Sequence, residues 1–302
     1  MPSLSVVITA GHDRQSGLVR STDSLLTASP AGQPEIIVAA CGCPDAARIT
    51  SCAAAVAGRG RVLTLSQVSA AAARTAGLAA ASGDYVGFLE AGDEVSPGWA
   101  QTLTAAAAHR PAIVRGEARV LHEGREHPSA FACARMARST PLHWYGELGS
   151  AIYRRDFVQG HALRFAADGP AGEADFQVRA VVAALLDREQ IALCPQAVCR
   201  RLITPEGPQA GRSLVAGSPG VYAALHELFV QHAAALPPAG VGLQYTMWII
   251  SLFVLARCAE YPQDGAAANA LAQRLLQENP CPDEYDQERR AMMSARRTAP
   301  KP

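Results

Sequence analysis

Residues 83–93 read GDYVGFLEAGD, and this stretch decides the fold. Its apolar run at 85–89 predicts a strand that is buried on both faces, and the acidic loop at 90–94 follows where that strand ends. Three similar apolar runs precede it, at residues 4–9, 35–40 and 61–65. These four runs predict the strands of one buried sheet.

Helical stretches separate these runs. Residue spacing and alanine content predict helices over 17–28, 45–57 and 69–81, and Pro97 opens a further helix. Strands that alternate with helices over short connections predict an α/β fold, with a mostly parallel sheet flanked by helices. In such sheets ligands bind beyond the carboxyl ends of the strands. Those ends are at residues 9–13, 39–45 and 90–94.

The rest of the chain is less regular. Residues 110–165 predict a mixed region with short strands, a helix follows at 172–186, and a last strand spans 190–202. We expect an α/β domain at 1–205, a linker or mobile loop at 206–220 and a C-terminal helical region at 221–302. In that region the pattern predicts helices at 221–235, 241–260 and 264–278. We treat these helices as a candidate homodimer interface.

Composition excludes several classes of protein. The chain has 302 residues, with 27 basic and 27 acidic side chains, and this balance argues against a nucleic-acid partner. With 49% hydrophobic and 18% charged residues the chain can bury a full core. No stretch reaches the roughly 18 to 20 apolar residues of a membrane span, and the N-terminus lacks a basic signal region. The eight cysteines fit neither a disulfide scaffold nor a zinc spacing, so we expect reduced thiols and a cytoplasmic protein.

Six segments, taken in order, resemble the family 2 glycosyltransferases of GT-A fold. They are SVVITAGH (5–12), EIIVAACGCPD (35–45), QVSAAAARTAG (67–77), GDYVGFLEAGD (83–93), GSAIYRRDFV (149–158) and GEADFQVR (172–179). The resemblance covers roughly residues 3–205. It implies transfer of a sugar from a nucleotide-sugar donor to a nucleophile of a small-molecule, lipid or polymer acceptor, with inversion at the sugar.

The resemblance also implies a divalent cation, Mg²⁺ or Mn²⁺, that holds the donor's diphosphate. Glu90 and Asp93 stand where the family keeps metal-binding acids, whereas the middle position is Gly92. Carboxylate oxygens at a strand end suit such a cation, which would act as a Lewis acid on the leaving diphosphate. The alternative is a solvated acidic loop between strand and helix, with Asp93 or Ser96 as the N-cap of the next helix.

The donor pocket departs from the family's pattern. The family's two acids after the second strand are here Ala40 and Cys41, whereas Arg74 matches an arginine that lines the family's pocket. Arg74 could instead pack against the sheet edge. Arg201 follows the last strand, and its guanidinium suits phosphate. The complete set of candidate donor-binding residues is Thr9, Ala10, His12, Cys41, Asp45, Arg74, Glu90 and Arg201.

An inverting transferase needs a general base beside the acceptor. The resemblance places Glu173 at the base position and Asp175 at the second acid, so Asp175 is the rival candidate. Both could instead form an acidic first turn that complements a helix dipole.

Two other functions stay open at this point. The lost polar positions of the donor pocket suit a catalytically inactive protein of the same fold that serves as a binding or scaffold subunit. The fold could also carry a different transfer reaction, since fold does not dictate chemistry. Acids retained at both ends of the site favour an enzyme.

Overall fold

The computed structural model describes most of the first 202 residues and part of the rest. The described residues are 1–10, 17–29, 34–42, 46–66, 68–122, 125–128, 148–166, 169–202 and 266–278, with single positions at 231, 248, 280, 281 and 283. The chain divides into two compact units, Met1–Pro205 and Glu206–Pro302. The candidate site belongs to the first unit.

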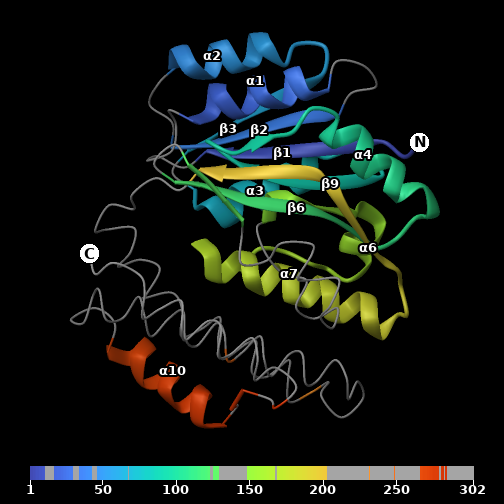
Figure 1. Ribbon diagram of the computed structural model, residues 1–302. Coiled ribbons are helices and arrows are strands. Elements are labelled where there is room, and N and C mark those ends of the chain that lie inside the picture. Colours follow the sequence, from blue (N-terminus) through green and yellow to red (C-terminus); the bar gives the residue numbers. More distant parts are fainter. Residues whose placement is uncertain are drawn as a thin grey trace. The chain divides into compact units, whose positions relative to one another are not determined.

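In the described part of the first unit, nine strands form one sheet (Figure 1). They are β1 (Leu4–Ala10), β2 (Glu35–Cys41), β3 (Gly60–Leu65), β4 (Tyr85–Glu90), β5 (Glu94–Val95), β6 (Ile113–His122), β7 (Arg125–Pro128), β8 (Ala151–Arg154) and β9 (Ile191–Leu202). The order is β3-β2-β1-β4-β8-β6-β9-β5, and β7 pairs with β6. All four strands predicted before residue 90 and the predicted last strand are present.

The sheet is parallel only in its first half. Strands β3, β2, β1 and β4 run parallel, as expected. Along the chain, one helix separates each of these strands from the following one. Beyond β4, the pairings β4–β8, β6–β8, β6–β7 and β5–β9 are antiparallel, and only β6–β9 is parallel. The expectation of a mostly parallel sheet therefore holds for β3 to β4 and needs correction beyond it. Among these pairs, β6 and β7 are separated by only two residues in the chain, and strands joined over so short a distance pair antiparallel.

Helices cover both faces of this sheet. They are α1 (Leu18–Ala28), α2 (Ala46–Ala55), α3 (Ala70–Ala80), α4 (Trp99–Ala106), α6 (Arg155–Gly160) and α7 (Gly169–Leu186). Helices α1 and α2 lie on one side of the sheet, and α3 and α7 lie on the other (Figure 1). Ser69 begins α3 as predicted: its hydroxyl accepts a hydrogen bond of 3.2 Å from the backbone N–H of Ala72, a typical N-cap contact.

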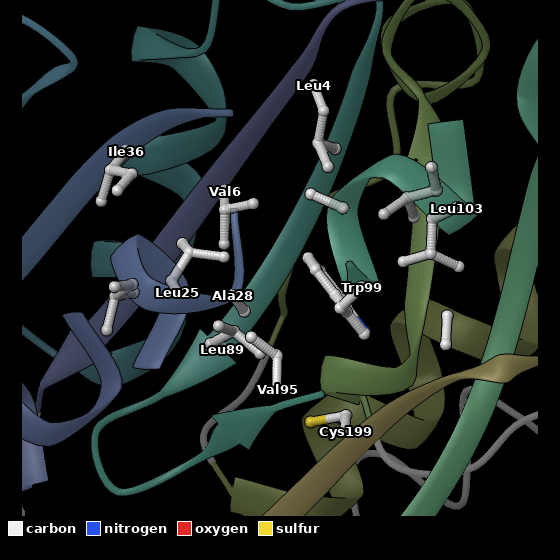
Figure 2. Close-up of a cluster of buried hydrophobic side chains, with 14 of the residues drawn as sticks. Leu4, Val6, Leu25, Ala28, Ile36, Leu89, Val95, Trp99, Leu103 and Cys199 are labelled. Carbon is white, nitrogen blue, oxygen red and sulfur yellow. The ribbon is translucent and has the colours of Figure 1, made fainter. Parts of the chain in front are cut away.

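The α1 side carries an apolar core. Strand residues such as Val6 and Leu89 pack with Leu25 of α1 and with Trp99 and Leu103 of α4 (Figure 2). Trp99 and Leu103 are fully buried. Because side chains alternate along a strand, the same strands present a second set of apolar residues to α3 and α7.

The opposite core is aromatic. Four rings contact one another there, with ring centres 4.3 to 6.3 Å apart in each contacting pair. They belong to Phe88 of β4, Tyr153 of β8, Phe165, which precedes α7, and Phe176 of α7. Phe165 and Phe176 are stacked, with centres 4.3 Å apart. This cluster fixes the first turns of α7 against the sheet.

The second unit is described mainly by α10 (Ala266–Glu278), which confirms the helix predicted at 264–278. The linker predicted at 206–220 and almost all of the helices predicted at 221–235 and 241–260 lie outside the described residues. Of the helices described, none combines the length and the apolar character needed to cross a membrane.

Candidate active site

The site lies at the carboxyl end of β4, on the side of the sheet covered by α3 and α7. Glu90 is the last residue of β4 and is paired in register with Thr9 of the parallel strand β1. Arg74 comes from α3, Glu173 from α7 and Arg201 from the end of β9. The consecutive elements α3 and β4 therefore meet the distant α7 and β9 at the edge where α/β sheets bind ligands.

Two arginines and two glutamates form a closed ring of ion pairs, which we call the Arg–Glu ring: Arg74, Glu90, Glu173 and Arg201. Arg74 Nη2 donates to Glu90 Oε1 and, over 2.8 Å, to Glu173 Oε1. Arg201 Nη1 donates to Glu173 Oε2 over 3.1 Å, and its Nη2 donates to Glu90 Oε2 over 3.2 Å. Each guanidinium thus bridges both carboxylates.

The ring runs from the interior of the protein toward its surface. The side chains of Arg74 and Glu173 are 1% and 3% exposed, whereas those of Glu90 and Arg201 are each 16% exposed. Replacing buried ion pairs with apolar residues often leaves stability unchanged or improves it, so such pairs are weak evidence for a structural role. Buried charges gathered at a strand end are instead typical of a functional site.

An aromatic stack supports Arg74 from behind. The Arg74 guanidinium carbon lies 5.3 Å from the centre of the Phe165 ring, which in turn stacks on Phe176. A cation over an aromatic face is stabilised by the ring's quadrupole. Phe176 lies three residues after Glu173 on α7, so the same helix positions both the stack and the carboxylate.

Arg74 has unused hydrogen-bond donors. Its Nε and Nη1 are buried and make no hydrogen bond with any residue that the structure describes. Unsatisfied buried donors are rare, because each loses its bonds to water without replacement. An oxyanion would satisfy donors of this kind, whereas a metal cation would not.

Glu173 has an unusual proton affinity. The pKa of Glu173 is raised to about 7: burial is the largest cause and the nearby Glu90 carboxylate adds to the rise, whereas Arg201 and Arg74 lower the pKa and offset part of it. A carboxyl group with a pKa near neutrality can accept a proton and release it again at physiological pH.

The structure separates the two candidate bases. Glu173 and Asp175 lie two positions apart on α7, so they project about 200° apart around the helix. Glu173 joins the Arg–Glu ring, whereas Asp175 accepts a hydrogen bond of 2.8 Å from Arg179 Nε, one turn along the same helix. Burial raises the pKa of Asp175, and Arg179 opposes that rise. Only Glu173 is placed with the other charged residues at the end of β4.

Asp93 is buried within the turn that follows β4. Its Oδ2 accepts a hydrogen bond of 2.9 Å from the backbone N–H of Glu90, and its own N–H donates to the Glu90 carbonyl over 2.9 Å. Gly92 between them has φ +107°, a conformation that residues with a Cβ rarely adopt. A Cβ on Gly17 would lie 2.4 Å from the Gly92 nitrogen, so α1 begins directly against this turn. The alternative of an Asp93 or Ser96 cap on the next helix is wrong, because the N-cap of α4 is Gly98 and no side chain caps the helix.

The residues present do not fit the divalent cation that the resemblance implies. Each carboxylate oxygen of Glu90 already accepts a guanidinium hydrogen bond, and Asp93 Oδ2 holds the turn. Within the described residues, no group of three or more His, Cys, Asp or Glu side chains could hold a metal ion. A divalent cation at Glu90 would also lie beside two guanidinium cations, which would repel it.

The remaining candidates line the neighbouring strand ends. Thr9 is buried, and its Oγ1 makes no hydrogen bond to the residues described. The buried thiol of Cys41 donates a hydrogen bond of 2.9 Å from Sγ to the carbonyl of Ala10, which links the ends of β1 and β2. His12 and Asp45 lie outside the described residues.

Sequence reasoning missed a second buried cation next to the ring. Arg115 of β6 is fully buried, and it donates to Gln177 Oε1 over 2.6 Å and to Ser150 Oγ over 3.2 Å. Gln177 lies four residues after Glu173, on the same face of α7. The available signal was an arginine directly after the apolar residues 112–114, within a region predicted only to contain short strands.

Comparisons with known proteins identify the family and the fold. Residues 5–156 match the family described as Glycosyl transferase family 2. The fold is similar to the crystal structure of S. aureus TarS 1–349 in complex with UDP, with 14% sequence identity and a TM-score of 0.53 over 77% of this chain and 72% of that chain. No curated protein sequence matches the chain.

Proposed function

The chain belongs to glycosyl transferase family 2 and is a glycosyltransferase, and from this premise we propose that it transfers a sugar with inversion from a nucleoside-diphosphate donor to an acceptor nucleophile. The observation that carries the proposal is the Arg–Glu ring at the carboxyl end of β4. It places cations for a diphosphate beside a carboxylate whose pKa is about 7.

The donor's diphosphate would bind to Arg201 and Arg74. Guanidinium groups form paired hydrogen bonds with phosphate oxygens, and Arg201 is the more exposed of the two. The sugar nucleotide would then extend along the ends of β1 and β2, past Thr9, Ala10 and Cys41. Because the structurally similar protein is described in complex with UDP, a uridine nucleotide is the first donor to test.

The transfer is a single displacement. A lone pair of the acceptor nucleophile forms a bond to the anomeric carbon, and its proton passes to the Glu173 carboxylate. The bond between that carbon and the diphosphate oxygen breaks, and its electron pair leaves with the nucleoside diphosphate. Charge develops on the leaving diphosphate, where fixed cations stabilise the transition state more than the ground state.

Glu173 is the base in this proposal, and Asp175 is not. A general base must come within hydrogen-bond reach of the proton that it takes, and Glu173 is the acid that lies with both arginines. Asp175 is held by Arg179 on another face of α7, so we assign it to positioning the helix.

A donor screen tests the proposal. The protein is incubated with UDP-, GDP-, dTDP- and ADP-sugars and with a panel of sugar, lipid and polymer acceptors, and release of the nucleoside diphosphate is measured. We expect release from one donor class, reduced about 100-fold or more in Glu173→Gln. The matched control is Glu189→Gln, which removes a glutamate that pairs with Arg154 outside the ring. If no donor binds by calorimetry and none is consumed, the proposal is wrong and the fold serves a binding role.

A further inference from the structure

We propose that the guanidinium groups of Arg74 and Arg201 take the place of a divalent cation toward the donor's diphosphate, so that this transferase binds its donor and transfers the sugar without a metal. The inference rests on the proposed function, and it concerns how the same site balances the charge of its substrate. Its ligand is the diphosphate group of a nucleoside diphosphate.

The donors of the ring match an oxyanion. Arg74 and Arg201 place two positive charges at the end of β4, each held by hydrogen bonds to both Glu90 and Glu173. Arg74 keeps two buried N–H groups, on Nε and Nη1, that no described residue accepts. In the ligand-free protein the carboxylates occupy the positions that phosphate oxygens would take on the guanidinium edges.

The acids at the end of β4 do not form a binding site for a divalent cation. The oxygens of Glu90 are engaged by guanidinium groups, and Asp93 Oδ2 accepts from the Glu90 backbone. The middle acid of the family's motif is Gly92, whose φ of +107° disfavours any side chain. The backbone conformation of the turn therefore disfavours an acidic side chain at this position.

Binding of the donor's diphosphate should make Glu173 a stronger base. When diphosphate oxygens bind Arg201, its hydrogen bonds to Glu90 and Glu173 are exchanged for bonds to phosphate. Arg201 lowers the pKa of Glu173, so its departure makes the Glu173 carboxylate a stronger base at the moment when donor is present. Arg74 keeps its contact with the Phe165 ring and provides the second guanidinium group of the site.

Calorimetry with UDP, or with whichever nucleoside diphosphate the donor screen identifies, tests the inference in the full-length protein. Titrations are run in excess EDTA and in Mn²⁺, and the variants are Arg201→Gln and Arg201→Lys. The matched control is Arg200→Gln, one position earlier on β9, where the side chain pairs with Glu126 instead of the ring. Adjacent strand residues project to opposite faces, so the control removes the same charge from outside the site.

We expect equal affinity in EDTA and in Mn²⁺, a loss of about 10- to 100-fold in Arg201→Gln, and a smaller loss in Arg201→Lys, which keeps the charge but not the paired donors. Arg200→Gln should bind like the unmodified protein. Binding that requires Mn²⁺ would overturn this inference and leave the proposed function standing, as would unchanged affinity in Arg201→Gln. An absence of nucleotide binding under both conditions would overturn the proposed function as well.

Discussion

The protonation of Glu173 should control the reaction rate. Burial raises the pKa of Glu173 to about 7, and only the ionised carboxylate can take the acceptor's proton. The rate should therefore rise with pH through about 7 and level off above it. In Glu173→Gln the neutral amide accepts no proton, so the rise should vanish together with most of the activity.

The size of the effect follows from the pKa. With a pKa of about 7, the Glu173 carboxyl is roughly one-eleventh ionised at pH 6 and roughly ten-elevenths ionised at pH 8, which gives about a tenfold change in rate. A glutamate with its ordinary pKa would be almost fully ionised at both values, and the rate would change by only a few per cent. Loss of the base itself lowers turnover by about 10²- to 10⁴-fold.

Initial rates of nucleoside diphosphate release, measured from pH 5 to 9 at donor concentrations well below KM, give the pH profile of kcat/KM, which reports the pKa of Glu173 in the free enzyme. Glu173→Asp keeps a carboxylate but withdraws it by one methylene, so it should keep the pH dependence at a lower rate. Asp175→Asn removes the rival acid, which pairs with Arg179, and should keep the profile of the unmodified protein. A rise near pH 7 that survives in Glu173→Gln and disappears in Asp175→Asn would refute the assignment.

Two predictions concern the scaffold. A methyl group at Gly77 of α3 would lie 2.3 Å from Val7 Cγ1, so Gly77→Ala should lower the free energy of unfolding by about 1–3 kcal/mol despite alanine's better helix propensity. Urea denaturation measures this, and adding Val7→Ala should make the two losses less than additive; full additivity would argue against the clash. Burial opposes the shift, but hydrogen bonds from Ser5 and Ser82 hold the pKa of Glu35 at about 2, below its unfolded value of 4.5. That stabilisation is present above pH 4.5 and is lost as the pH falls toward 2, so stability should drop by about 2 kcal/mol over this range, after a discount for partial exposure. Glu35→Gln should flatten this acid arm of the stability profile, and an unchanged arm would contradict the assignment.

Much of the scaffold was predictable from local pattern. The apolar run before Glu90 marks β4, and the serine at position 69 marks the start of α3, because strand burial and helix capping leave signals within a few residues. The mixed half of the sheet was not predictable in the same way, because the direction of pairing beyond β4 depends on connections and not on strand composition.

The candidate site was also predictable only in part from the sequence. The order of motifs along the chain indicated which residue types stand at the strand ends, including Glu90, Arg74 and Glu173. It left Glu173 and Asp175 as rivals. In the folded protein Glu173 pairs with Arg74 and Asp175 pairs with Arg179, because residues two positions apart project from different faces of a helix, and our proposal of Glu173 as the base rests on this difference.

From the sequence alone follow the α/β alternation, the family resemblance and the places of the acids. The partners of those acids depend on the tertiary structure. Arg74 meets Glu173 across 99 residues, and Arg201 meets Glu90 across 111. No local periodicity spans such separations. Only the folded sheet brings α3, α7 and β9 to the end of β4, and there the acids expected to bind a metal pair with guanidinium groups.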